Sequence, residues 1–141
     1  MSTHPRIVLT RVDHAHLEQI LQSAGGRRDL EMLREEIERA EIVEPDAIPA
    51  DVVTMNSTVR FVDEDSGAEN EVTLVFPAYA DMAANRISVL APVGSALLGL
   101  TVGDSIDWPM PASTSHTLRV VAVTYQPEAA GGPLGMSPDE D

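Results

Sequence analysis

The sequence predicts an α+β protein, in which a short N-terminal antiparallel helical hairpin precedes a bent antiparallel sheet that carries one small helix. Three observations predict this fold class. Apolar residues in the first 44 positions recur at helical spacing. Residues 58–76 and 105–125 contain short runs in which apolar and polar side chains alternate, as in strands. A compact apolar run at 93–98, stopped by a glycine, fits one small helix.

The first helix is expected to run from a cap at Thr10 or Asp13 to about Ala24. Either side chain has an oxygen that can accept a hydrogen bond from a free amide of the first turn. Its apolar positions fall on one helical face and are Leu17, Ile20, Leu21 and Ala24. The pair Gly25–Gly26 then interrupts the helix, which predicts a tight turn.

The second helix is expected from about Arg28 to Ile42. Leu30, Leu33, Ile37 and Ala40 are spaced as in a coiled-coil seam. Glu44 precedes a proline and therefore disfavours helical backbone, so the hairpin is predicted to occupy residues 1–44. A hairpin this short is marginal alone and needs a domain or a partner to pack against.

The second predicted module covers residues 45–127. Its first strands are expected at Val52–Met55, Thr58–Val62 and Glu71–Phe76, with a turn at Asp65–Gly67 between the last two. A strand at Ile87–Leu90, the small helix at Val93–Leu98 and strands at Ser105–Trp108 and Leu118–Tyr125 follow. Residues 128–141 are rich in proline, glycine and acids, which predicts a disordered acidic tail.

Composition excludes several classes of function. The chain has 141 residues and a net charge of −14, and all nine of its basic residues are arginine. Such a chain is repelled by phosphate backbones, so no direct nucleic-acid binding is expected. It contains no cysteine, which excludes disulfides and thiolate metal sites and is compatible with a reducing cytoplasm. No segment approaches the roughly 20 apolar residues that span a bilayer.

The search for catalytic chemistry gives no candidate. The four histidines do not converge with other ligands, and His14 and His16 lie on different sides of the first helix. The acids at 63–65 lack the spacing of a calcium loop and are expected to form a solvated hairpin tip. We therefore expect no catalytic residue, no metal and no cofactor.

One stretch carries a resemblance. Residues 88–99 fit the pattern S-V-x-x-P-[IV]-x-x-x-L-[IL]-G, and V-G-D follows at 102–104. This pattern resembles the FKBP-like C-terminal domain of the GreA/GreB transcript-cleavage factors. The short hairpin and the joining segment PADVVTMNSTVRF look like a shorter relative within that family. The resemblance covers roughly residues 5 to 127.

The resemblance implies a partner. In the family, the loop before the small helix docks on core RNA polymerase at the rim of the secondary channel, and here that loop is Leu90, Ala91, Pro92 and Val93. Pro92 and Val93 match the family's pattern. Leu90 and Ala91 depart from it, because the cleavage factors have an acidic or polar residue and a serine there. The resemblance thus implies a cytoplasmic, non-enzymatic regulator that docks through these residues.

The resemblance also locates the hairpin tip, at Arg27, Arg28 and Asp29. The cleavage factors carry an Asp-x-x-Glu pair at the tip that helps to hold a metal ion. Here Asp29 has two arginine neighbours, and residue 32 is Met. An arm of about 14 residues spans only roughly 20 Å. We therefore expect the protein to compete with the cleavage factors without cleaving RNA.

Two alternatives remain open. One is a protein-binding module with a different partner, affecting nucleotide metabolism. The other is a prolyl isomerase, a chemistry that other FKBP-like proteins perform in a pocket lined by several aromatic residues. With aromatics at 4% of the chain, such a lining is hard to assemble. A monomer is favoured over a dimer, although an exposed seam on the hairpin would allow dimerisation.

Overall fold

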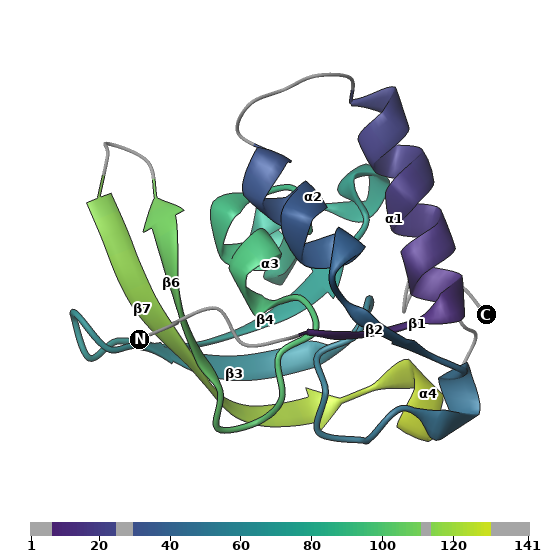
Figure 1. The fold of residues 1–141 in the computed structure, drawn as a ribbon. Coiled ribbons are helices and arrows are strands. Elements are labelled where there is room, and N and C mark those ends of the chain that lie inside the picture. The colour runs from purple at the N-terminus through teal and green to yellow at the C-terminus, as the bar shows by residue number, and fades with distance from the viewer. Residues whose placement is uncertain (1–6, 25–29, 111–113, 131–141) are drawn as a thin grey trace.

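The computed structural model describes residues 7–24, 30–110 and 114–130. A five-stranded sheet in the order β5-β4-β3-β7-β6 carries α1, α2 and α3 on one side, and a separate two-stranded sheet joins β1 and β2 (Figure 1). The α+β class is thereby confirmed. The strands are β1 Val8–Thr10, β2 Glu41–Val43, β3 Thr58–Asp63, β4 Glu69–Val75, β5 Arg86–Ser88, β6 Ser105–Met110 and β7 Thr114–Tyr125. The helices are α1 Arg11–Ser23, α2 Glu31–Glu38, α3 Pro92–Leu97 and α4 Pro127–Ala130, with 3-10 turns η2 Pro45–Ala47, η3 Pro77–Tyr79 and η4 Met82–Ala84.

The sheet is antiparallel along most of its width. β3 lies at its centre, and its register with β7 shifts twice, between Thr58 and Val59 and between Arg60 and Phe61. Such shifts place an extra residue on one strand and bend the ladder. The edge strand β5 departs from the predicted pattern, because it pairs with β4 in parallel. Residues 76–85, which include η3 and η4, carry the chain back along β4, so that β5 can run parallel to it.

Helix α1 begins where the sequence predicted. Thr10 is its N-cap, and its Oγ1 accepts a hydrogen bond from the amide of Asp13 at 3.0 Å. Asp13, the alternative cap, instead lies inside the first turn, and its side chain is buried. The sequence thus located the start of the helix, while the position of Asp13 depends on packing that only the structure shows.

The prediction that the second helix extends to Ile42 is wrong. Helix α2 ends at Glu38, and residues 41–43 form β2, which pairs in parallel with β1. The amide of Glu41 donates to the carbonyl of Ile7 at 2.9 Å. A local helical pattern cannot reveal this pairing, since the partner strand lies at the other end of the hairpin.

The predicted strand at Val52–Met55 is also wrong. This segment makes a single antiparallel bridge, between Val52 and Thr101, and then runs through the core as buried, irregular chain. Its backbone forms hydrogen bonds with the loop after α3. The amide of Val53 donates to the carbonyl of Leu100 at 2.8 Å, and the carbonyl of Val53 accepts from the amide of Gly99 at 2.8 Å. The apolar pattern therefore correctly indicated burial, but not a strand.

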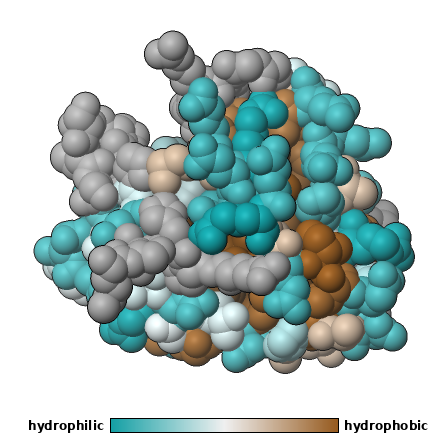
Figure 2. Space-filling model, in the orientation of Figure 1, coloured by the Kyte–Doolittle hydropathy of each residue, from teal (hydrophilic) through white to brown (hydrophobic). Residues whose placement is uncertain are grey.

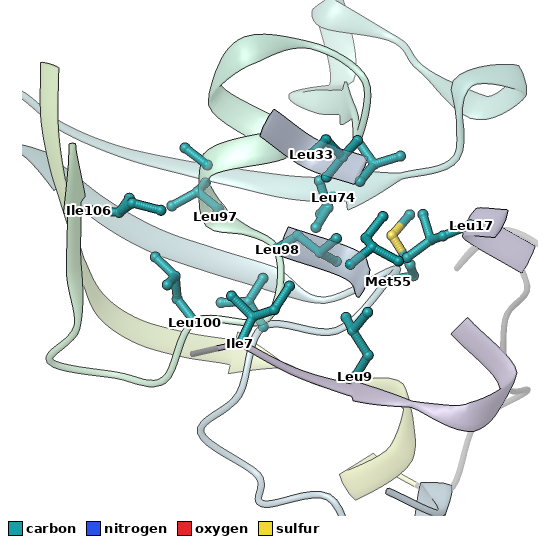
Figure 3. Packing of buried hydrophobic residues seen from close by; sticks show 14 of the residues in the cluster. Ile7, Leu9, Leu17, Leu33, Met55, Leu74, Leu97, Leu98, Leu100 and Ile106 are labelled. Carbon is teal, nitrogen blue, oxygen red and sulfur yellow. The ribbon is translucent and has the colours of Figure 1, made fainter. Parts of the chain in front are cut away.

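A single apolar cluster joins the N-terminal helices to the sheet. In Figure 3 the labelled side chains from β1, α1, α2, the chain around Met55, β4, the end of α3 and β6 converge on one region. The seam residues of the second helix are buried here, with Leu30, Leu33 and Ile37 at most 2% exposed. Because the seam is covered within the chain, it is not a free dimerisation face. Figure 2 shows polar residues over much of the face in view, with an apolar patch over β1 and β2.

The C-terminal segment is ordered further than expected. The sequence predicted a disordered tail from residue 128, but Pro127–Ala130 form α4. Thr54 donates to the carboxylate of Glu128 at 2.7 Å, which fixes this helix against the chain before β3. Residues 131–141 lie outside the described part. The division of the chain at residues 44 and 127 stays a prediction.

Candidate functional site

The loop that joins β5 to α3 is built to a fixed shape. The carbonyl of Ser88 accepts from the amide of Ala91 at 3.0 Å, and the Ser88 hydroxyl accepts from the amide of Leu90 at 3.0 Å. The hydroxyl of Ser95 donates back to the carbonyl of Val89 at 2.7 Å. These bonds tie the predicted docking residues to the strand before them and to the helix after them.

Sequence chemistry explains the sharp start of α3. Pro92 occupies the first helical turn, where a missing amide hydrogen costs nothing, and Ala91 precedes it in extended backbone. Gly94 is required because a Cβ there would lie 2.1 Å from the carbonyl oxygen of Ser88. The helix therefore presses directly on the end of β5, and the loop has little freedom to move.

The four predicted docking residues differ in exposure. Pro92 is exposed, whereas Leu90, Ala91 and Val93 are partly buried. Leu90 and Val93 also pack against the edge of the apolar cluster. The structure thus brings all four together at one surface, with Pro92 protruding and two apolar side chains anchored behind it.

An open groove begins at Leu90. It has a volume of about 540 Å³ and runs between the C-terminal half of α1 and the chain at η3. Its lining residues are Gln19, Ile20, Ser23, Ala24, Phe76, Pro77, Ala78 and Leu90. Phe76 is fixed at the inner edge by an edge-to-face contact with His16, with ring centroids 5.6 Å apart. The groove makes the docking loop one end of a longer, mainly apolar surface.

Sequence reasoning missed this groove. Its walls come from α1 and from residues 76–78, which are far apart in the chain. Ile20 was assigned to the packed face of the first helix, and no element was predicted between the strands at 71–76 and 87–90. The available signal was the uncharged, mainly apolar run Pro-Ala-Tyr-Ala at 77–80, which a solvated loop does not require. Tyr79 and Met82, at 39% and 78% exposed, are further exposed apolar residues in the segment that follows Ala78.

The predicted hairpin tip cannot be placed. Arg27, Arg28 and Asp29 lie outside the described residues. The helices that lead to it are joined by a bond from the Arg34 guanidinium to the carbonyl of Leu21, at 2.8 Å. This bond satisfies one of the carbonyls left free at the end of α1.

A second cluster of polar residues lies at the tip of the β3–β4 hairpin. His116 Nδ1 is hydrogen-bonded to Asp63, and Asp65 accepts from the amide of Thr117 at 2.8 Å. The hydrogen bond to Asp63 raises the pKa of His116, and the same bond lowers the pKa of Asp63. In the described part of the chain, these three side chains are the group whose ligand atoms could converge on a metal, lying within 4.8 Å of one another. The expectation that no histidine converges with other possible ligands is therefore wrong for His116. The hydrogen bonds among these residues already account for the arrangement, as a link between the hairpin tip and β7.

No helix within residues 7–24, 30–110 and 114–130 has both the length and the apolar character to cross a membrane.

Comparison with known proteins matches both halves of the chain. The family model "Transcription elongation factor, GreA/GreB, C-term" matches residues 48–125, and the model "Rnk N-terminus" matches residues 5–43. The "Regulator of nucleoside diphosphate kinase" of Escherichia coli strain K12 is 40% identical over 131 residues, which cover 92% of this chain and 96% of that protein. The "Transcription elongation factor GreA" of Azorhizobium caulinodans is 36% identical over 78% of this chain and 69% of its own length.

A solved structure supports the fold. The "Prokaryotic transcription elongation factor GreA/GreB from Nitrosomonas europaea" shares 48% sequence identity with this chain. The superposition covers 86% of this chain and 99% of that one, with a TM-score of 0.68. The likeness thus extends across the N-terminal helices as well as the sheet.

Proposed function

Since the chain belongs to the GreA/GreB family of transcription elongation factors and carries the N-terminal region of its Rnk members, we propose that it is a cytoplasmic regulator that binds core RNA polymerase. The proposed place of binding is the rim of the secondary channel. The protein has no cleavage activity of its own in this proposal. It acts by occupying a site that the transcript-cleavage factors of the same family also use.

The observation that carries the proposal is the shape of the docking loop. Pro92 protrudes from a loop held by Ser88 and Ser95, so the surface is formed before any partner arrives. A preorganised loop loses little conformational entropy on binding. The groove that begins at Leu90 adds apolar area beside it, and such area on a small protein commonly marks a partner site.

The proposal includes the architecture on which the surface is mounted. We assign residues 45–127 to an FKBP-like domain and residues 1–44 to a helical hairpin that enters the mouth of the channel. The strand order of the sheet and the packing of α3 against the end of β5 support the first assignment. The bond between Arg34 and Leu21, and the shared burial of Leu17 and Leu33, support the second.

The net charge agrees with a protein partner. At −14, the chain is attracted to a basic surface and repelled by nucleic acid. Binding to polymerase would therefore be made through protein contacts. The proposed binding does not require a dimer. The apolar seam of α2, which could have joined two chains, is already buried within one chain.

Two features support the proposed lack of cleavage activity: the short length of the N-terminal helices and the small number of carboxylates that could hold a metal ion. Helix α1 has 13 residues, and at 1.5 Å each it spans roughly 20 Å. The predicted tip offers one carboxylate, Asp29, beside two arginines. Metal-assisted cleavage needs several ligands in fixed positions around the ion, and this arm does not supply them.

Competition tests the proposal directly. Core polymerase is bound to a labelled transcript-cleavage factor, and the full chain is titrated against it. We expect displacement to completion, with a midpoint that rises linearly with the concentration of the labelled factor. A protein that binds polymerase without displacing the factor, or that does not bind it at all, would refute the shared site.

One relative favours a second candidate. The name "Regulator of nucleoside diphosphate kinase" belongs to a protein similar over nearly the whole of this chain. A protein-binding module with another partner, affecting nucleotide metabolism, is therefore the alternative. The same titration separates the two, since this alternative gives no displacement from polymerase. Prolyl isomerisation is disfavoured, because Phe76 is the only aromatic residue among the described residues that line the groove.

A further inference from the structure

A buried carboxyl group lies at the start of α1, close to the segment before β3 that also holds α4. Asp13 is the third residue of α1, and it is only 1% exposed. Its Oδ2 accepts a hydrogen bond from the amide of Met55 at 3.0 Å. Its Oδ1 is buried and has no hydrogen-bond partner among the described residues. A carboxylate in this position would keep its charge away from water with half of its acceptor capacity unused, which is costly.

A second carboxyl group is held by the residue next to Met55. Thr54 donates its hydroxyl proton to Glu128 of α4 at 2.7 Å. The Thr54 amide donates to the Ser57 hydroxyl at 3.0 Å, and the two hydroxyls lie 2.7 Å apart. The segment before β3 therefore holds Asp13 from α1 and Glu128 from α4 on adjacent residues. Figure 1 shows α4 on the side of the molecule where α1 begins.

Gln126 completes the attachment of α4. Its side-chain amide donates to the carbonyls of Pro49 and Val52, at 2.8 and 2.9 Å, and the residue is 4% exposed. These bonds and the Thr54–Glu128 bond fix a helix of only four residues. A helix this short has no stability of its own, so its position depends on these side-chain contacts.

Two physical causes favour the protonated form of Asp13. Burial raises the pKa of Asp13 to about 7; the bond from Met55 opposes this, and the negative charge of Glu128 adds to it. The effect of Glu128 would be lost if α4 moved away, because its negative charge would recede from Asp13. Ionisation and undocking of α4 therefore favour each other.

The other charged groups of this region face water. Arg11, at the start of α1, pairs with Glu44 after β2 at 3.1 Å, and both side chains are exposed. Asp46 on η2 and Asp51 before Val52 are exposed as well. Solvent screens these charges, so Glu128 is the charged neighbour that acts on Asp13.

We propose that Asp13, Thr54 and Glu128 form a proton-controlled clasp, in which protonated Asp13 keeps α4 docked and ionised Asp13 releases α4 from the chain before β3. The proton leaves to solvent water, and no other bond forms or breaks. The clasp links the first helix to the C-terminal segment, so the protein would change its C-terminal surface near neutral pH. This switch is independent of polymerase binding.

Hydrogen exchange followed by NMR tests the release of α4. The amide of Ala130 donates to the carbonyl of Gln126 at 3.0 Å and reports on α4, and the amide of Val120 donates to Asp104 at 3.0 Å and reports on the sheet. After correction for intrinsic rates, we expect Ala130 to lose about tenfold protection between about pH 5.5 and about pH 8.5, while Val120 keeps its own. Equal loss at both amides, or none at Ala130, would overturn the clasp.

Variants identify the responsible group. Asp13→Asn retains an oxygen for Met55 and cannot ionise, so Ala130 should stay protected over the whole range. Asp46→Asn, a change at an exposed acid on η2, should behave as the parent does. The clasp is refuted if Asp13→Asn shows the parent's pH dependence.

A measurement on the parent protein covers the case in which Asp13→Asn fails to fold. The carboxyl carbon of Asp13 should titrate near pH 7 in the parent. In Glu128→Gln the midpoint should fall, because a repelling charge is gone. Titration of Asp13 at the ordinary value of 3.8 would overturn the proposal.

Discussion

Single residues decide whether the proposed docking surface works. Pro92 protrudes, while Leu90 and Val93 connect the loop to the apolar cluster. This division means that a change at the loop can act on binding, on folding, or on both. Tests at this scale therefore need a stability measurement beside each binding measurement.

Val93→Asp is expected to weaken binding to core polymerase by at least about tenfold, or about 1.4 kcal/mol. A charge at an apolar contact must be desolvated without a partner when the complex forms. Fluorescence anisotropy with labelled protein measures the affinity, and thermal unfolding of the free protein shows whether the variant is folded. Val102→Asp is the matched control, because Val102 is an exposed valine outside the loop, at 37%. A folded Val93→Asp protein with parental affinity would show that the loop is not the docking site.

The pair of His116 and Asp63 predicts a pH dependence of stability. The folded-state pKa of His116 is raised, so its contribution is fully present below the unfolded value of 6.5 and is lost as the pH rises through the folded value. The folded-state pKa of Asp63 is lowered, so its contribution is present above 3.8 and is lost as the pH falls through the folded value. The pair thus stabilises the hairpin tip between these limits.

His116→Gln should remove the alkaline side of this dependence. We expect the melting temperature of the variant to change less than that of the parent as the pH rises above 6.5. Thermal unfolding across a pH series measures it. A variant whose melting curve follows the parent at every pH would mean that the His116–Asp63 bond does not contribute.

At the scale of secondary-structure elements, the sequence predicted helices and strands well where one face is buried. The spacing of Leu17 and Leu21, and of Leu33 and Ile37, identified the buried faces of α1 and α2, and the glycine at 99 ended α3. The parallel pairing of β1 with β2, the irregular chain at 52–57 and the groove escaped prediction. Each depends on contacts between segments far apart in the chain, which local periodicity does not record.

Leu33→Ala tests whether α2 is part of the common core. Leu33 is 1% exposed, and removing a buried side chain of this size costs about 2 to 5 kcal/mol in the free energy of unfolding. Urea denaturation followed by circular dichroism measures the loss. Met82→Ala, at a side chain 78% exposed, should change stability by no more than about 0.5 kcal/mol. Similar effects of the two substitutions would contradict the packing.

At the scale of the whole molecule, the N-terminal helices and the docking loop are joined to one apolar core. The apolar cluster includes residues from both predicted modules, so these helices and this loop keep a fixed relation. In the proposed function, the N-terminal helices must lie at a fixed position relative to the docking loop. Their position after docking then decides whether they exclude a transcript-cleavage factor from the same site. The sequence predicted both parts and that the hairpin must pack against a domain or a partner, and the structure shows that the domain provides this core.

The protein alone should leave a backtracked polymerase complex uncut. Its predicted tip has one acid at Asp29, and α1 spans roughly 20 Å. Added in excess before a transcript-cleavage factor, it should slow cleavage by that factor. A gel of the nascent RNA, with each protein alone and with both, shows both effects. Shortened RNA with this protein alone would refute the non-enzymatic assignment, and unchanged cleavage with both would refute the shared site.

The position of β1 has a consequence for synthesis of the chain on the ribosome. The amide of Val8 donates to the carbonyl of Gly99 at 3.1 Å, and a Cβ on Gly99 would lie 2.6 Å from Cβ of Ile7. Ile7 and Val8 thus pack against backbone that is made only after most of the chain has been synthesised. The N-terminal helices, marginal when alone, must wait for it with their apolar faces uncovered. During that interval these faces are exposed to water, and folding can be completed only after β7, which pairs with the central strand β3, has also left the exit tunnel.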